Sequence, residues 1–243
     1  MLRLILNGLF LLIFFIISIP LFLMEWIIGR FNRHAMVSSS QMIVVNAFHV
    51  ILFLSGVKKT AIGTENIPKN EAILYVANHR SYFDVPVAYT TLPTLTGFIA
   101  KKEIGKVPFL RTWMRLIQCI LMDRDNIRDG LRAILKGIEQ IKDGYSIFIS
   151  PEGTRNHGED MLPFKEGSLK MAEKTGCAII PVAISNADEV FENHMPRVKA
   201  AHVVIEYGKP IYPKDLDKEN LKFLGAYVQG IIRDMLKKNA SLI

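Results

Sequence analysis

The sequence predicts an α/β protein whose mixed, largely parallel sheet is flanked by helices and preceded by an N-terminal two-helix membrane anchor. Beyond about residue 57, short apolar runs alternate with segments of helical periodicity, which is typical of a sheet with helices packed against it. Before that point the chain is strongly apolar and contains a long uncharged stretch. We therefore divide the chain into a two-helix membrane-anchoring segment, residues 1–56, and an α/β domain, residues 57–243.

The first expected helix covers residues 4–24, which contain no charged side chain. A helix of this length is about 31 Å long, close to the thickness of the hydrocarbon core of a bilayer. No Ala-x-Ala-like cleavage site is present, so we do not expect a signal peptide that is removed. A buried core helix is the alternative, but a helix that is apolar on nearly every side favours contact with lipid.

A second helix is expected over residues 36–54, with one apolar stripe and one weaker, more polar stripe. The two helices can cross the bilayer as a hairpin, which places Arg30 and Arg33 on the side opposite the α/β domain. Alternatively, both can lie in one leaflet as a monotopic anchor. Since Lys and Arg are enriched on the cytoplasmic side of membranes, the arginines favour the one-leaflet arrangement.

Six strands are expected in the α/β domain, after a membrane-to-domain junction at about residues 55–64. Each is a short apolar run bounded by polar or turn-forming residues. Their ranges are 72–77, 97–100, 118–122, 145–149, 178–184 and 202–207.

Two longer helices are predicted there by apolar residues that recur every three or four positions. The first covers residues 127–142 and places five apolar side chains on one face, and the second covers residues 219–238 with an inward-facing apolar row. The first face comprises Leu131, Ile134, Leu135, Ile138 and Ile141, and the second row comprises Leu221, Leu224, Val228, Ile231, Ile232 and Met235.

The composition limits the classes of ligand. Half of the residues are apolar, and the formal net charge is +7. Without a nucleic-acid-binding motif, this charge indicates an anionic membrane surface, a phosphorylated ligand or an acidic carrier protein. Cys119 and Cys177 lie in apolar runs, and we expect them to be reduced core residues in a reducing compartment. No His-x-x-x-His or Cys-x-x-Cys spacing occurs, so we expect no metal site.

A short segment, residues 78–84, combines a histidine and a carboxylate where a predicted strand gives way to a helix. A carboxylate bonded to one ring nitrogen of a histidine leaves the other nitrogen free to accept a proton. In a continuous helix His79 and Asp84 would lie about 140° apart, so they meet only if the chain turns between them. Ser81 and Asp84 form a capping-box pattern, which places Asp84 at a helix N-terminus and His79 in the preceding turn. The alternative is that Asp84 only caps the helix.

Three further segments follow this one along the chain. Residues 121–124 (Leu-Met-Asp-Arg) end a predicted strand, residues 148–155 contain Pro-Glu-Gly-Thr-Arg, and residues 179–184 form an apolar strand with an early proline. Together with the His-x4-Asp motif, they resemble the four motifs of the glycerolipid acyltransferases, in the order found in that family. The resemblance is specifically to the 1-acylglycerol-3-phosphate acyltransferases. The main departure is Ser150, where the family usually has phenylalanine.

The resemblance implies transfer of a fatty acyl group from a thioester to the free 2-hydroxyl of 1-acylglycerol-3-phosphate (lysophosphatidate), which gives phosphatidate. His79 would deprotonate the hydroxyl, with Asp84 orienting the ring, and the substrate oxygen would attack the thioester carbon directly. No serine stands in a nucleophile elbow, and neither cysteine neighbours a basic or catalytic residue, so an acyl-enzyme is not required.

The phosphate of the acceptor calls for arginine or backbone N–H groups. By resemblance we assign substrate binding to residues in and around the second and third motifs. The alternative for Arg124 is a surface ion pair with Asp123 or Asp125, and the alternative for Arg155 is a loop salt bridge with Glu152. For Lys101 the alternative is a solvated charge run. Glu152 either positions Arg155 or bonds the glycerol hydroxyl. The assigned residues are Arg124, Glu152, Gly153, Thr154, Arg155 and Lys101.

We expect no cofactor, because the acyl thioester of acyl carrier protein or coenzyme A is a co-substrate. The expected partners are the phospholipid bilayer, lysophosphatidate and the acyl donor, without nucleic acid, at the cytoplasmic face of a membrane. The alternatives are an acyltransferase for another lysolipid or for glycerol-3-phosphate, and a non-catalytic membrane module that binds anionic lysolipid. A pure binder has no need of an oriented base, so His79 and Asp84 favour the enzyme.

Overall fold

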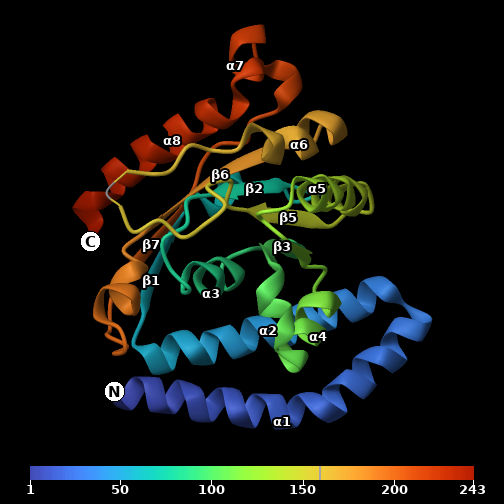
Figure 1. The fold of residues 1–243 in the computed structure, drawn as a ribbon, viewed down its shortest axis with the longest axis vertical. Coiled ribbons are helices and arrows are strands. Elements are labelled where there is room, and N and C mark those ends of the chain that lie inside the picture. The colour runs from blue at the N-terminus through green and yellow to red at the C-terminus, as the bar shows by residue number, and fades with distance from the viewer. Residues whose placement is uncertain (159) are drawn as a thin grey trace.

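A computed structural model describes residues 1–158 and 160–243 and has a seven-stranded sheet at its centre. Neighbouring strands are parallel, except that β6 and β7 are antiparallel, so the sheet is mixed and largely parallel, as predicted (Figure 1). In spatial order the strands are β1 (Lys58–Ile62), β7 (His202–Tyr207), β6 (Ile179–Ser185), β2 (Leu74–Ala77), β5 (Ser146–Ile149), β3 (Thr96–Lys101) and β4 (Ile120–Met122).

Helices cover both faces of the sheet (Figure 1). Side chains alternate between the faces along each strand, so Tyr75 of β2 packs into one hydrophobic cluster and Leu74 into the other. One face is covered by α2 (Arg33–Ser55), α3 (Asp84–Tyr89) and α4 (Pro108–Leu116). The other face is covered by α5 (Ile127–Lys142), α6 (Lys170–Thr175) and α8 (Leu224–Asn239). The first helix, α1 (Leu2–Phe31), lies outside α2, away from the sheet.

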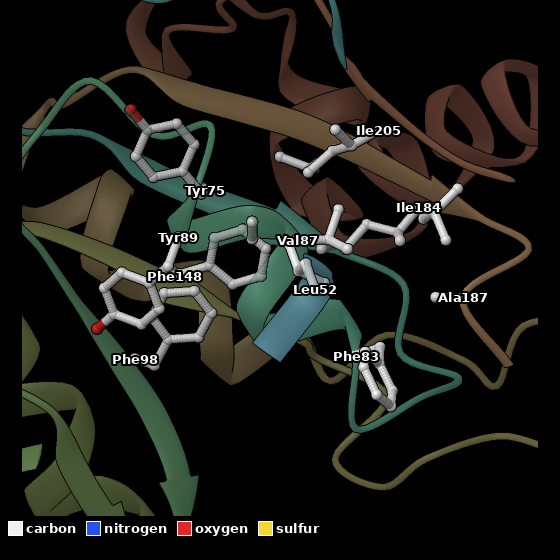
Figure 2. Packing of buried hydrophobic residues seen from close by; sticks show 14 of the residues in the cluster. Leu52, Tyr75, Phe83, Val87, Tyr89, Phe98, Phe148, Ile184, Ala187 and Ile205 are labelled. Carbon is white, nitrogen blue, oxygen red and sulfur yellow. The ribbon is translucent and has the colours of Figure 1, made fainter. Parts of the chain in front are cut away.

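Aromatic packing fixes α3 on the sheet. The ring of Tyr89 in α3 stacks on Phe98 of β3, and Phe98 stacks on Phe148 of β5, with ring centroids 4.4 Å apart in both pairs (Figure 2). Leu52 of α2 belongs to the same buried cluster. Because α3 begins directly after residues 78–83, this packing also fixes the turn that carries His79.

The two N-terminal helices are longer than predicted. The first continues beyond residue 24 to Phe31, and the second begins at Arg33, so only Asn32 lies between them. Arg30 therefore lies within α1 and Arg33 within α2, rather than in a connecting loop. The division into two domains at residues 56 and 57 stays a prediction.

Helix α1 has a narrow polar side and a broad apolar side. Asn7, Ser18 and Glu25 are buried against the rest of the protein, and Ser18 accepts a hydrogen bond of 2.8 Å from the indole of Trp113 in α4. The large apolar side chains on the rest of the helix are exposed, which indicates membrane association. They include Ile5, Leu9, Leu12, Ile16, Ile19 and Leu23.

The predicted junction at residues 55–64 contains a strand that the sequence analysis missed. Residues Lys58–Ile62 form β1, which pairs in parallel with β7 at the edge of the sheet. Its sequence, Lys-Lys-Thr-Ala-Ile, is mostly polar, because an edge strand has a solvent-exposed side. The six predicted strands correspond to β2 through β7, with ends that shift by at most two residues.

The range predicted for the helix at residues 127–142 is confirmed as α5, but the predicted apolar face is wrong for two of its residues. Leu131 and Leu135 are exposed, while the buried side of the helix includes the small residues Ala133 and Gly137. A Cβ atom at Gly137 would lie 2.3 Å from the sulfur of Met171 in α6. The close approach of the two helices therefore turns the small side chains inward.

The helix predicted over residues 219–238 is divided into α7 (Lys218–Lys222) and α8. The division occurs because the carboxylate of Glu166 accepts hydrogen bonds from the backbone N–H groups of Gly225 and Ala226, at 2.7 and 3.2 Å, and so starts a new helix. Of the predicted inward row, Leu224, Val228, Ile232 and Met235 are buried in α8.

Candidate active site

The predicted site residues lie where the parallel strands end, which we call the carboxyl edge of the sheet. Strands β2, β5, β3 and β4 are neighbours and parallel, so their carboxyl ends share that edge. His79 follows β2, Glu152 follows β5, Lys101 ends β3 and Arg124 follows β4. Ligands commonly bind at the carboxyl ends of the strands in sheets of this kind.

His79 and Asp84 are in direct contact. The ring nitrogen Nδ1 of His79 lies 2.8 Å from Oδ2 of Asp84. The side chain of His79 remains 18% exposed, whereas that of Asp84 is only 5% exposed. With Nδ1 bonded to the carboxylate, Nε2 is the nitrogen that can exchange a proton with a substrate.

The turn between these residues is closed by the same carboxylate. Oδ2 of Asp84 also accepts hydrogen bonds from the backbone N–H groups of Arg80 and Ser81, both at 2.9 Å. The hydroxyl of Ser81 accepts from the N–H of Phe83 at 2.9 Å. Only half of the predicted capping box is present, because the Ser81 hydroxyl bonds the N–H of Phe83 rather than that of Asp84. Asp84 is the first residue of α3, as predicted, and its carboxylate orients His79.

Glu152 supports the backbone of this turn. One carboxylate oxygen accepts from the N–H of His79 at 2.8 Å, and the other accepts from the N–H of Leu162 at 2.9 Å. Burial raises the pKa of the Glu152 carboxyl above its ordinary value, and these hydrogen bonds act in the opposite direction. Both oxygens are thus engaged with backbone donors, and a direct role of Glu152 in binding substrate stays a prediction.

Arg124 and Gly153 connect the second and third motifs. The guanidinium of Arg124 donates to the carbonyl of Gly153, whose φ of +76° favours glycine. Burial lowers the pKa of the Arg124 guanidinium, and the neighbouring Arg155 acts in the same direction. The Nε atom of Arg124 is buried and has no hydrogen-bond partner in residues 1–158 and 160–243.

Arg155 lies over an aromatic ring. Its guanidinium carbon is 3.5 Å from the ring centroid of Tyr82, and one of its nitrogens donates to the Tyr82 hydroxyl at 2.9 Å. A second nitrogen lies 3.4 Å from a carboxylate oxygen of Glu192. The alternative considered for Arg155, a loop salt bridge with Glu152, is replaced by these contacts, and 28% of the Arg155 side chain remains exposed.

Glu192 is a residue of the site that the sequence analysis missed. It lies in a short 3-10 turn after β6, and its side chain is only 2% exposed. Besides Arg155, its carboxylate accepts from the hydroxyl of Ser81 and the backbone N–H of Tyr82, both at 2.7 Å. Glu192 therefore joins the turn of His79 to the arginine of the third motif.

Two other polar residues hold the same turn and were also missed. The side-chain amide of Asn78 donates to the carbonyl of Ile184 at 2.9 Å and accepts from its N–H at 2.8 Å, which ties the end of β2 to β6. Asp188 forms an ion pair of 3.2 Å with Arg80. Asn78 stands directly before His79 in the sequence, but nothing in the sequence pattern marks Asp188 or Glu192.

Two predicted binding residues have weaker connections. Thr154 is exposed, beside Gly153 and Arg155 in the sequence. Lys101 is exposed at the end of β3 and lies 3.8 Å from Glu103. Both stand at the shared edge of the sheet, and their roles in binding stay predictions.

Comparison with known proteins identifies the family of the chain. The family model described as Acyltransferase matches residues 58–185. A 1-acyl-sn-glycerol-3-phosphate acyltransferase of Borreliella burgdorferi is 32% identical over 80% of this chain and 76% of the relative. The corresponding protein of Saccharomyces cerevisiae is 29% identical over 79% of this chain and 64% of the relative.

A solved structure is similar over almost the whole length. The crystal structure of the 1-acyl-sn-glycerophosphate (LPA) acyltransferase PlsC from Thermotoga maritima matches with a TM-score of 0.76 at 26% identity, and the match covers 97% of each chain. The fold, the family model and the relatives therefore agree, and this chain belongs to the acyltransferase family.

Proposed function

We propose that this protein is a 1-acylglycerol-3-phosphate O-acyltransferase, which transfers a fatty acyl group from a thioester to lysophosphatidate and produces phosphatidate. The observation that carries the proposal is the oriented pair of His79 and Asp84, 2.8 Å apart at the carboxyl edge of the sheet. The relatives that match most of the chain bear the name of this activity.

In the proposed reaction, Nε2 of His79 takes the proton of the acceptor's 2-hydroxyl while Asp84 stabilises the imidazolium that forms. The hydroxyl oxygen attacks the thioester carbonyl carbon and forms the new ester bond. The carbon–sulfur bond then breaks, and the sulfur leaves with the proton returned from His79. These bond changes and proton transfers need no oxidant, no reductant and no acyl-enzyme.

Arg124 and Arg155 are proposed to bind the acceptor phosphate. Arginine presents several N–H donors in a planar fork that suits phosphate oxygens. The buried Nε of Arg124, which lacks a partner in the described residues, and the partial exposure of Arg155 support this role. Glu192 and Tyr82 would hold Arg155 in place for the phosphate.

The anchor is proposed to lie in one leaflet at the cytoplasmic face of the membrane. Two contacts support this arrangement: Arg33 donates to the side chain of Gln118 at 3.1 Å, and Gln41 bonds the backbone of Thr94 and Thr96 at 2.8 Å. These contacts hold α2 along the α/β domain. The outer side of α1 would then face the acyl chains that surround the lipid acceptor.

An acyl-transfer assay with purified protein tests the proposal. Acyl carrier protein and coenzyme A thioesters are offered separately with lysophosphatidate, other lysolipids or glycerol-3-phosphate as acceptor. We expect phosphatidate from lysophosphatidate with at least one donor. Transfer to another acceptor alone would reassign the substrate, and lysolipid binding without any transfer would identify a non-catalytic membrane module.

A further inference from the structure

The outer side of α5 carries a row of exposed apolar side chains. Ile127 is 92% exposed, Leu131 is 60% exposed and Leu135 is 53% exposed. Their spacing of four residues aligns them along about 12 Å of the helix. Three large aliphatic side chains in one exposed row are typical of a contact surface.

A row of basic side chains runs beside the apolar row. Arg128, Arg132 and Lys136 are exposed, and each follows one of the apolar residues in the sequence. None of the three forms an ion pair with the residues that the structure describes. The acidic residues nearby are Asp123 and Asp125 before the helix, Asp129 in its first turn, and Glu139 beyond Lys136. The carboxylate of Asp129 accepts a hydrogen bond of 2.7 Å from the backbone N–H of Asp123. We call these six apolar and basic residues the α5 face, and its complement is a surface that is acidic and apolar.

The α5 face begins beside the candidate active site. Ile127 follows Arg124 by three residues, so the row begins at the edge of the sheet that carries His79. A shallow hollow of about 510 Å³ adjoins the start of the row and is lined by Asp123, Asp125, Asn126, Ile127 and Arg128.

The α5 face is also separated from the expected membrane contact. Helix α5 packs on the sheet face opposite to that of α2, and α1 lies beyond α2 (Figure 1). A flat bilayer surface that contacts the outer side of α1 would have to bend around the sheet to reach the α5 face. A partner from solution can reach it without displacing the anchor.

We propose that the α5 face docks an acidic acyl carrier protein, which presents its thioester to the site at the edge of the sheet. This inference rests on the proposed function, because that function requires a thioester donor. The basic row supplies electrostatic attraction to an acidic partner, and the apolar row supplies contact area that is desolvated on docking.

Two other occupants fit the α5 face less well. A coenzyme A thioester has phosphates for a basic site but no surface that needs an exposed apolar row along two turns of helix. A second copy packed by a twofold axis perpendicular to α5 would make the two helices antiparallel and place one basic row against the other, and like charges in such contacts are unfavourable.

Donor-specific kinetics test the proposal. Two double variants alter the α5 face, Arg128→Glu with Arg132→Glu, and Leu131→Gln with Leu135→Gln. Both are assayed with carrier-protein and coenzyme A thioesters of the same fatty acid at saturating lysophosphatidate. We expect each variant to raise the KM for the carrier-protein donor about tenfold or more. The KM for the coenzyme A donor should change less than about twofold, because this donor does not need the surface.

The matched control is Arg233→Glu with Lys237→Glu on α8. These residues are also exposed and four positions apart, so the change of charge is the same on another helix. The proposal would be overturned if the control pair raised the KM for the carrier-protein donor as much as the α5 pair does. It would also be overturned if the α5 variants raised the KM for both donors equally. Reduced binding of Arg128→Glu with Arg132→Glu to phosphatidylglycerol vesicles, with both donors equally affected, would assign the face to the bilayer instead.

The assay separates this inference from the proposed function. If wild-type protein uses only the coenzyme A donor, the docking surface is refuted and the acyltransferase activity stands. If it uses neither donor, the proposed function itself fails.

Discussion

At the scale of single residues, the site depends on carboxylates that hold other groups in place. Asp84 fixes the ring of His79, Glu152 fixes its backbone, and Glu192 joins Tyr82 to Arg155. Each of these acidic side chains is buried. Since a buried carboxylate is costly without donors around it, such contacts hold a single arrangement of the turn.

Glu192→Gln should weaken binding of the acceptor. The amide keeps the shape but loses the charge that attracts Arg155, and it can offer only one oxygen to Ser81 and Tyr82. We expect the KM for lysophosphatidate to rise about tenfold, with a smaller change in kcat. The control is Glu189→Gln, which removes a more exposed carboxylate that pairs with His194 in the same segment. An unchanged KM in folded Glu192→Gln protein would remove this residue from the site.

Arg124→Lys and Arg155→Lys should also raise the KM for lysophosphatidate. Each keeps its charge but loses the planar fork, and Lys at position 124 cannot provide the buried Nε. Steady-state kinetics with each substrate varied should show a smaller effect on the donor. Arg197→Lys, at an exposed position outside the motifs, is the control. If both variants bind acceptor like wild type, the phosphate is bound elsewhere.

The sequence indicated His79 by its place after an apolar run, and it indicated Arg124 and Glu152 by the resemblance of their motifs to those of the family. His79, Arg124 and Glu152 all stand just beyond strand ends, and parallel pairing places those ends at one edge. Glu192 could not be predicted in this way. It lies in a 3-10 turn without periodicity, and it contacts Ser81, which is 111 residues away in the sequence.

At the scale of elements, the sequence predicted where α5 lies but not how it is rotated. A helical pattern shows which residues share a face, whereas the closest packing partner decides which face is buried. Here Gly137 meets the fully buried Met171, and this contact turns Leu131 and Leu135 to the outside. The edge strand β1 was missed for a related reason, since its polar sequence reflects its exposed position.

Two glycines of α5 should respond in opposite ways to alanine. A Cβ at Gly130 has only the sulfur of Met122 within 4 Å, at 3.9 Å. Gly130→Ala should therefore stabilise the protein by roughly 0.5–1 kcal/mol, because alanine favours the helix. At Gly137 the Cβ would lie 2.3 Å from the sulfur of Met171, so Gly137→Ala should destabilise by about 1–3 kcal/mol. Urea unfolding measures both, and stabilisation by both would show that α5 and α6 are not packed closely.

At the scale of the whole molecule, the sheet separates two surfaces. Helices α1 and α2 form one side, with exposed apolar residues on α1, and the α5 face belongs to the other side. A lipid acceptor and an acidic carrier protein would thus approach from different sides of the sheet. Both would meet at the edge that carries His79.

The one-leaflet arrangement predicts the accessibility of the turn between α1 and α2. A cysteine at Arg30, in a background without Cys119 and Cys177, should react with a membrane-impermeant reagent from the cytoplasmic side only. Arg30 lies close to Arg33, which contacts Gln118 in the α/β domain. A cysteine at the exposed residue Lys237 marks the side of the α/β domain as a control. Labelling of position 30 from the opposite side alone would establish a transmembrane hairpin.

The rate of phosphatidate formation by His79→Ala tests the central claim most directly. Wild type and variant are compared with the same thioester and lysophosphatidate, and circular dichroism and membrane flotation confirm that both are folded and bound to membranes. Since general base catalysis contributes about 100- to 10,000-fold, we predict a loss of kcat within or beyond this range. A folded His79→Ala protein with near wild-type turnover would contradict the assignment of His79 as the base.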